Sequence, residues 1–262
     1  MRRNRETNLY HCTKEDSLIK IIESKFFKYS YCIEPYYGHK GTKYRLEKLA
    51  YAMVCFADMY ADELPDHMKQ FSSNSYIMMD KKWAENKQIS PVIYYNKNSR
   101  SNWAFLSMNN RKEDLSGYTN NEDIEKICDM LEKSIELIRP LFKQYKGKYY
   151  INGTDKESEN EVEFFLEREW RSFPFVTGGE HLHLDLNDYK NPETRGKYQN
   201  ELLEHGYCLA FDWNDILQIG CRRKKKKEIL KTIQKSFGVS KKEARKKIKI
   251  IHPALNHFSK IF

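Results

Sequence analysis

Residues 164–175 read FFLEREWRSFPF and alternate charged side chains with large apolar ones. A period of two is typical of a β-strand, because successive side chains of a strand point to opposite faces. The predicted strand therefore carries a row of side chains on one face, namely Phe165, Glu167, Glu169 and Arg171. Charge in the middle of an otherwise aromatic segment indicates a strand that lines a cleft.

The charged row makes Glu167, Glu169 and Arg171 the candidate catalytic residues. Two carboxylates on one face disfavour each other's ionised form, and an arginine beside them relieves that effect. A carboxylate held in this way can stabilise positive charge that develops on a substrate. The structural alternative is an edge strand whose solvent face is charged.

The composition is that of a folded protein. The chain has 262 residues, of which 40% are hydrophobic and 14% aromatic, so it is not expected to be disordered. No apolar run approaches the ~18 residues of a transmembrane helix, and the N-terminal residues lack the apolar stretch of a secretory signal. We therefore expect a cytoplasmic protein without a membrane partner. Six cysteines without a CxxC pair favour neither a zinc module nor a disulfide framework, and no metal is expected.

Positive charge is concentrated at the C-terminal end. Residues 222–262 hold 15 Lys and Arg against two acids, a net +13, whereas the whole chain carries +9, so the remainder carries −4. Such a local patch suits phosphate backbones or acidic partners, although a solvated charge run is the simpler interpretation. The cations expected to contact nucleic acid are Arg222, Arg223, Lys224, Lys225, Lys226, Lys227, Lys246 and Lys247.

Short strands interleaved irregularly with helices favour an α+β fold. Strands are predicted at 9–13, 52–59, 75–80 and 91–96, and helices after Thr13, after Asp80, over 120–146 until Pro140, and before Gly238. Thr13 and Asp80 are expected to act as N-caps, and Ser240 with Glu243 has the pattern of a capping box. The tyrosine-rich residues 26–44 have no clear period and are expected to form a loop. We expect a main domain over 1–221, with the basic helix–strand extension 222–262 packed on it.

Two histidine-containing segments are weaker candidates. LYHCT (9–13) can present His11 and a hydroxyl to a ligand at the end of an apolar strand. Taken alone, a histidine satisfied at the end of the sheet, with Thr13 as a helix cap, is the favoured interpretation. HLHLD (181–185) would place His181, His183 and Asp185 on one face of a strand, but no second cluster supplies more ligands, so a surface loop is favoured. Rossmann, P-loop and hydrolase motifs are missing from the sequence.

The order of several short segments resembles a known family. LYHCT, MVCFADM, SYIMMDKKWA with PVIYY, EREWRSFPF and LAFDWNDILQI follow one another as in the AbiG-type abortive-infection proteins of bacteria, specifically the AbiGi component. The resemblance covers most of the chain and is strongest in 9–27, 52–95 and 164–221. It implies a role in antiviral defence within a two-gene toxin–antitoxin system, and a cognate protein encoded by the neighbouring gene.

The AbiGi family in turn is similar to ADP-ribosyltransferases, including DarT-type modifiers of nucleic acid. This likeness implies a split mixed or antiparallel sheet with flanking helices, NAD as substrate, and a nucleic acid or protein as acceptor. Glu169 would be the catalytic glutamate of an E-x-E pair with Glu167, and His11 would hold the ribose. The residues implied to bind the cofactor are Tyr10, His11, Thr13, Cys55, Phe56 and Tyr76. On the predicted strand 52–59, Asp58 is an alternative to Cys55 and Phe56. Tyr36 or Tyr37 is an alternative to Tyr76 for stacking on nicotinamide.

Three functions therefore stay open at this point. In the first, a fixed Glu169 carboxylate stabilises the oxocarbenium-like state formed when the nicotinamide–ribose bond of NAD breaks, while Arg171 tunes Glu169 or binds a phosphate. In the second, the protein is an antitoxin or regulatory partner that keeps a transferase-like fold without turnover. In the third, the basic C-terminal segment binds nucleic acid through the phosphate backbone, which is compatible with either of the others.

Overall fold

The computed structural model describes residues 6–40, 43–96, 98–116, 122–150, 154, 156–174 and 182–251. The chain divides into two units, each built from segments far apart in the sequence. Unit 1 comprises Met1–Lys28, Cys55–Ile89 and Leu209–Phe262, and unit 2 comprises Tyr29–Val54 and Ser90–Cys208. The long strand β4 (Lys43–Met59) begins in unit 2 and ends in unit 1. The predicted boundary at residue 221 stays a prediction.

Unit 1 is built on a mixed sheet with the strand order β13–β12–β5–β1–β4. The other four strands are β1 (Asn8–Thr13), β5 (Ser75–Met79), β12 (Ile216–Cys221) and β13 (Ile248–Ile250). The β12–β13 pair is parallel, and the other pairs are antiparallel. The remaining elements are α1 (Glu15–Ser24), β2 (Phe26–Phe27), α2 (Leu64–Gln70), α3 (Lys81–Asn86), β11 (Leu209–Ala210), η3 (Trp213–Asp215), η4 (Arg223–Lys225), α8 (Lys226–Phe237) and α9 (Lys241–Lys247).

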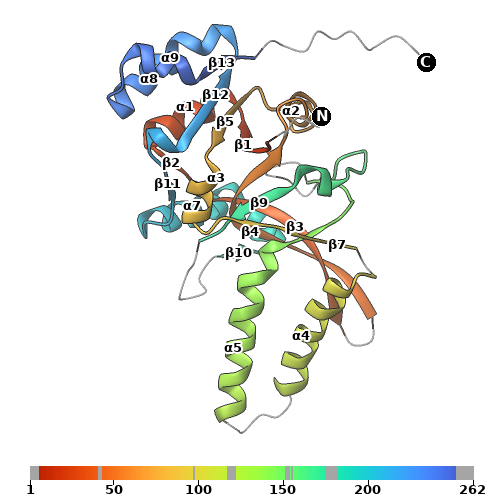
Figure 1. Ribbon diagram of the computed structural model, residues 1–262. Coiled ribbons are helices and arrows are strands. Elements are labelled where there is room, and N and C mark those ends of the chain that lie inside the picture. The colour runs from red at the N-terminus through yellow and green to blue at the C-terminus, as the bar shows by residue number, and fades with distance from the viewer. Residues whose placement is uncertain are drawn as a thin grey trace, which may run out of the picture. The chain divides into compact units, whose positions relative to one another are not determined.

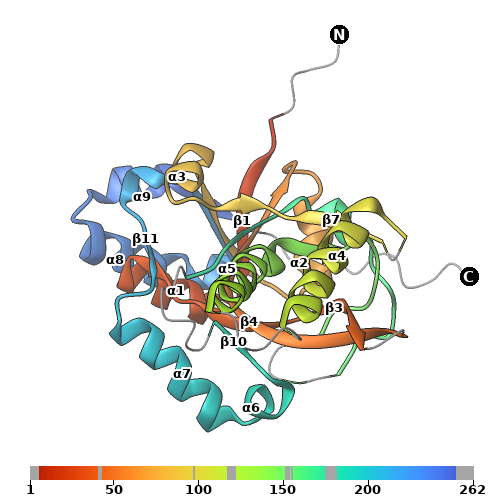
Figure 2. The ribbon, with the colours of Figure 1, turned by 90° about the horizontal axis from the view of Figure 1, so that it is seen from below.

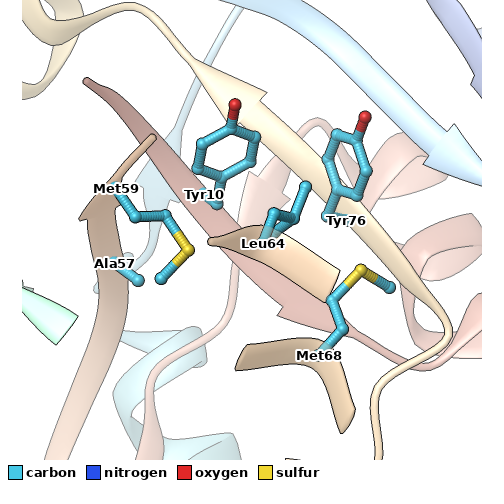
Figure 3. Close-up of a cluster of buried hydrophobic side chains, with 6 residues drawn as sticks. All are labelled: Tyr10, Ala57, Met59, Leu64, Met68 and Tyr76. Carbon is cyan, nitrogen blue, oxygen red and sulfur yellow. The ribbon is translucent and has the colours of Figure 1, made fainter. Parts of the chain in front are cut away.

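The core of unit 1 lies on both faces of this sheet. Helix α1 packs against α8, and both bury apolar residues four apart, Leu18 and Ile22 in α1 and Ile229 and Ile233 in α8, as an amphipathic helix does. A second cluster gathers Tyr10, Ala57, Met59, Leu64, Met68 and Tyr76 (Figure 3). Fully burying each such large side chain stabilises the fold by roughly 1.5–3 kcal/mol.

Most helix ends in unit 1 follow the predicted local signals. The Asp80 side chain accepts a hydrogen bond from Lys82 N at 2.8 Å, and Gly238, at a φ of 67°, ends α8 because glycine adopts the left-handed region without strain. Ser240 and Glu243 form the predicted capping box. The expectation for Thr13 is wrong, because β1 continues through it and Lys14 stands at the N-cap. The Glu15 N–H donates instead to Asn74 Oδ1 at 2.9 Å.

Unit 2 contains a long antiparallel hairpin of β3 (Ser30–Lys40) and β4, paired from Ser30↔Met53 to Lys40↔Lys43. The prediction of a loop over 26–44 is therefore wrong. Tyrosine favours the pleated, half-buried surface of a sheet, and Tyr31 and Ile33 of β3 are buried. Strand β10 (His183–Leu184) pairs with β4 at Tyr51. The other short strands are β6 (Ser90–Pro91), β7 (Ile93–Tyr95), β8 (Phe142–Gln144) and β9 (Glu169–Ser172).

The helices of unit 2 are arranged in two pairs. Helices α4 (Arg100–Ser116) and α5 (Glu122–Ile138) lie side by side (Figure 1), and α5 gives way to the 3₁₀ turn η1 (Arg139–Leu141) at Pro140, as predicted. Helix α6 (Leu186–Lys190) is followed by α7 (Pro192–Glu204), as Figure 2 shows. Helix α7 packs against β3.

The segment 164–175 differs from its predicted form. Phe164–Glu167 form the 3₁₀ turn η2, Arg168 has a φ of 45°, and only Glu169–Ser172 are a strand. The turn buries Phe164 and Glu167, three residues apart, and exposes Phe165 and Leu166, as the three-residue period of a 3₁₀ helix requires. The prediction of one continuous strand with a charged face over this segment is therefore wrong. Phe175 lies outside the described residues.

Two glycines provide a test of the packing. A Cβ on Gly220 of β12 would lie 2.0 Å from the buried Tyr76 ring, whereas a Cβ on Gly196 of α7 meets nothing within 4 Å. We expect Gly220→Ala to lower the free energy of unfolding by about 1–3 kcal/mol and Gly196→Ala to raise it by about 0.5–1 kcal/mol. Urea denaturation measures both, and an unchanged stability of Gly220→Ala contradicts the described packing.

Both units combine helices with strands, and antiparallel strand pairs predominate in each. The predicted α+β class is thereby confirmed. Among the described residues, no helix combines the length and apolar character needed to span a bilayer.

Candidate functional site

Five charged side chains of unit 2 form a group in which four are buried and Glu34 is half-buried. We call it the ionic cluster: Glu34, Lys143, Glu167, Glu169 and Arg171. Arg171 is 0% exposed, Glu169 5%, and Lys143 and Glu167 8% each. Burying charges is costly unless they are paired and hydrogen-bonded. The members come from β3, β8, η2 and β9, so several separate segments must fold together to make the cluster.

Arg171 is the centre of the cluster. Its Nε donates to Glu169 Oε1 at 2.9 Å and its Nη2 donates to Glu169 Oε2 at 3.1 Å, which is the bidentate geometry of a strong pair. Nη2 also donates to Glu34 Oε1 at 2.5 Å, and Nη1 donates to the Pro140 carbonyl at 2.6 Å. The η1 turn therefore supplies a backbone acceptor, and Arg171 binds three segments together.

Lys143 connects the two acids of the predicted E-x-E pair. Its Nζ donates to Glu169 Oε2 at 2.5 Å and to Glu167 Oε2 at 3.1 Å, and lies 4.4 Å from the centroid of the Phe164 ring. Both oxygens of Glu169 thus accept from cations. In contrast, Glu167 Oε1 is buried, and no residue that the structure describes forms a hydrogen bond with it. The two acids therefore differ in how completely they are paired.

The charges of the ionic cluster do not balance, because three carboxylates face two cations. Burial raises the pKa of Glu167 and of Glu34, and the cations beside them oppose that shift without cancelling it. Burial lowers the pKa of Lys143, but the neighbouring Glu167 and Glu169 outweigh it and raise the pKa above its ordinary value. Lys143 is therefore charged at neutral pH, and the excess negative charge falls on the carboxyl groups.

The structure brings the three predicted catalytic residues together, but it adds two members that sequence reasoning missed. Lys143 lies beyond Pro140, where the helix predicted over 120–146 is disturbed, and Glu34 lies in the segment interpreted as a loop. The charge count of the segment was a signal for one of the missing members: if Glu167 and Glu169 are buried, Arg171 balances only one of them, and a further cation is required. Nothing in the local sequence singled out Lys143 among the 46 Lys and Arg of the chain.

The residues predicted to bind cofactor all lie in unit 1, on β1, β4 and β5. His11 Nδ1 donates to the Cys55 carbonyl at 2.9 Å, and its ring lies 5.0 Å from Phe27 and 5.6 Å from Phe56 between centroids. Burial lowers the pKa of His11, so the ring is neutral at pH 7. Phe56 is 1% exposed, and the Thr13 carbonyl accepts from Ser75 Oγ at 2.8 Å.

These residues are divided between the two faces of the unit 1 sheet. Tyr10 and Tyr76 meet edge to face at 5.4 Å in the cluster of Figure 3, which also contains Ala57. His11 and Phe56 are the chain neighbours of Tyr10 and Ala57, so they point to the opposite face. Asp58, the alternative on β4, pairs with Lys81 at 2.9 Å. Tyr36 in unit 2 donates to Glu47 Oε2 at 2.6 Å.

The weaker metal candidate is only partly described. His183 belongs to β10 and is half-buried, and the Asp185 side chain caps α6 by accepting from Asn187 N and Asp188 N. His181 lies outside the described residues. Among the described residues, no group of three His, Cys, Asp or Glu side chains is arranged to hold a metal ion.

Fold and site together define an α+β protein in which the conspicuous E-x-E pair belongs to a buried ionic cluster. The sequence matches, over residues 25–221, the protein family described as "Putative abortive phage resistance protein AbiGi, antitoxin". Because the match covers most of the chain, the protein belongs to the AbiGi family, and the predicted resemblance to AbiGi is confirmed. Membership implies a role in phage resistance. Comparisons with curated proteins and with solved structures gave no match.

Proposed function

We propose that this AbiGi protein is the antitoxin of an abortive-infection system and acts by binding a cognate protein rather than by turning over NAD. The observation that carries the proposal is the state of Glu169. It is 5% exposed, and both of its oxygens accept from Arg171 or Lys143. A carboxylate that must bond the ribose of NAD needs an acceptor directed at the substrate, whereas this geometry is that of a structural ion pair.

The environment of His11 supports the same proposal. Its Nδ1 is used by the Cys55 carbonyl, and its ring packs among Phe27 and Phe56. A ring nitrogen bonded to a backbone carbonyl and a ring packed on aromatic side chains are typical of a structural histidine. The description of the family as an antitoxin agrees with a protein whose activity is binding.

Helix α5 supplies a surface suited to such a partner. Ile127 is 47% exposed and Met130 69% exposed, although large apolar side chains on a helix normally face a core. Glu122–Ile138 contain six acids and two lysines, so the apolar residues are surrounded by negative charge. A cognate protein with an apolar centre and a basic rim fits this surface, because interfaces combine buried apolar anchors with complementary charge.

The proposed interface is tested by the double variant Ile127→Ala/Met130→Ala. We expect its dissociation constant for the purified cognate protein to rise at least tenfold, about 1.4 kcal/mol, because truncation removes two apolar anchors. Isothermal titration calorimetry measures the change. Leu217→Ala, at a residue 39% exposed on β12 of unit 1, is the control and should leave the constant within about twofold. Equal affinity of wild type and double variant contradicts α5 as the binding surface.

An NAD-dependent ADP-ribosyltransferase acting on nucleic acid or protein is the second candidate. The observation that favours it is Glu167 Oε1, a buried acceptor of the E-x-E pair to which no side chain or backbone group in the described part of the chain donates. In this candidate the Glu169 carboxylate, with Glu167 beside it in unit 2, would face the NAD ribose. Incubation of the wild-type protein with NAD and cell extract distinguishes the two candidates, since only the enzyme releases nicotinamide.

A further inference from the structure

The cations of the C-terminal segment fall into two groups with different roles. Arg222 donates from Nε to Glu15 Oε2 at 2.9 Å, and Lys225 lies between Asp16 at 3.1 Å and Glu228 at 2.9 Å. Lys247 donates to the Trp213 carbonyl at 2.7 Å and lies 4.5 Å from the centroid of the Trp213 ring. These three cations hold the segment in unit 1 and are not free to bind a ligand.

Ten other cations of this segment are exposed, and we call them the outer cations. They are Arg223, Lys224, Lys227, Lys231, Lys235, Lys241, Lys242, Arg245, Lys246 and Lys249. Within the described part of the chain, no carboxylate forms an ion pair with any of them. Lys226, which was also predicted to contact nucleic acid, is half-buried.

The outer cations are held on rigid elements. Lys227, Lys231 and Lys235 follow one another at intervals of four, so they form a stripe along one side of α8. The opposite side of α8 buries Ile229 and Ile233, both 0% exposed. Helix α9 packs on α8 and continues into β13 (Figure 1). The positive charges are therefore fixed relative to one another before any ligand arrives.

Negative charge does not interrupt this surface. The segment 222–251 contains two acids, and both are used locally. Glu228 pairs with Lys225 at 2.9 Å, and Glu243 accepts from Ser240 N at 2.9 Å in the capping box of α9. A cationic surface without compensating acids produces a local field that attracts polyanions.

We propose that the outer cations bind the phosphate backbone of double-stranded nucleic acid, which adds a second activity to the proposed antitoxin. In the described part of α8, α9 and β13, no large apolar side chain is exposed, whereas the centre of a protein interface is apolar. An aromatic platform for unstacked bases, which single-stranded binding uses, is likewise missing from the exposed residues of these elements. Backbone contacts alone make this binding independent of sequence.

Fluorescence anisotropy with labelled 24-base-pair DNA and RNA duplexes of arbitrary sequence tests the proposal. The full-length protein should bind, and log K should fall steeply with log salt, because each phosphate contact contributes a slope of about −0.9. The fourfold variant Lys227→Gln/Lys231→Gln/Lys235→Gln/Lys242→Gln should bind at least tenfold more weakly at low salt. Its salt slope should be smaller by about 2–4. The two duplexes distinguish DNA from RNA as the source of the phosphates.

A matched control separates this surface from net charge. Lys69, Lys87, Lys133 and Lys156 are exposed and lie outside the C-terminal segment, and their replacement by Gln removes the same charge. The control should bind duplexes as the wild type does. Equal losses in both fourfold variants, or no binding by wild type, overturn the proposal. The surface would instead be a protein interface if the wild type binds no duplex and the fourfold C-terminal variant has lost its affinity for the cognate protein. Affinity of the fourfold variant for the cognate protein reports on the antitoxin function separately.

Discussion

Replacement of Arg171 by methionine is expected to lower the free energy of unfolding by about 3–5 kcal/mol, since it leaves buried carboxylates without their counterion. Arg171 is fully buried and donates to Glu34, Glu169 and the Pro140 carbonyl. In the variant, Lys143 is the one cation of the ionic cluster that remains beside its three carboxylates. Chemical denaturation followed by circular dichroism measures the loss.

The Arg171→Met deficit should also depend on pH. Burial already raises the pKa of Glu34, and loss of the guanidinium raises it further. A carboxyl group with a raised folded-state pKa contributes stability below its unfolded pKa, and this contribution is lost as pH rises through the folded pKa. The deficit of the variant is therefore largest at neutral and alkaline pH and shrinks as pH falls towards 4.5.

An exposed ion pair provides the control for Arg171→Met. Lys146 and Glu161 are 3.2 Å apart, with side chains 51% and 56% exposed. Lys146→Met should change the free energy of unfolding by no more than about 0.5 kcal/mol. A loss below about 1 kcal/mol for Arg171→Met, or a deficit that does not change with pH, contradicts a structural role for the ionic cluster.

The second large effect is an asymmetry between two neighbouring Glu→Gln substitutions. Both oxygens of Glu169 accept from cationic donors, so an amide in either orientation places its NH₂ opposite one of them. We expect Glu169→Gln to cost about 2–3 kcal/mol, because a buried charged donor loses its acceptor. Glu167→Gln can keep its oxygen on Lys143 and direct its NH₂ to the position of Oε1, which accepts no hydrogen bond from the residues described in the structure.

Glu167→Gln is expected to be neutral or stabilising at pH 8, because it removes the excess negative charge of the ionic cluster. Burial raises the pKa of Glu167, so wild type loses stability as pH rises through that pKa, whereas the variant does not. Its advantage should therefore disappear towards pH 4.5. Denaturation curves of both variants over this range measure the asymmetry, and equal losses in the two variants are incompatible with the described hydrogen bonds.

Local features of the fold were predictable from sequence. Asp80, Gly238 and the Ser240–Glu243 pair act within one helical turn of their own position, and Pro140 ends α5 by the covalent structure of its ring. Such signals need no knowledge of the rest of the fold. The same reasoning predicted that Glu169 and Arg171 would lie together, since they are two residues apart.

Long-range features were not predictable in this way. Glu34 and Arg171 meet although 137 residues separate them, and a charge pair carries no trace of its partner in the local sequence. Arg168 adopts a left-handed conformation that arginine rarely takes, so the break between η2 and β9 left no signal. The tyrosines of β3 were misinterpreted because their pairing partner β4 determines the strand.

The most direct test of binding without catalysis is rescue of growth in cells that produce the cognate protein. The Glu169→Gln variant is coexpressed with the cognate protein, and its amount of soluble protein is matched to that of wild type by immunoblot. This matching corrects for the lower stability of the variant. Binding without catalysis predicts that wild type and variant restore growth equally. Rescue by wild type but not by an equal amount of soluble Glu169→Gln would show that the carboxylate performs chemistry, and would contradict the proposed mode of action.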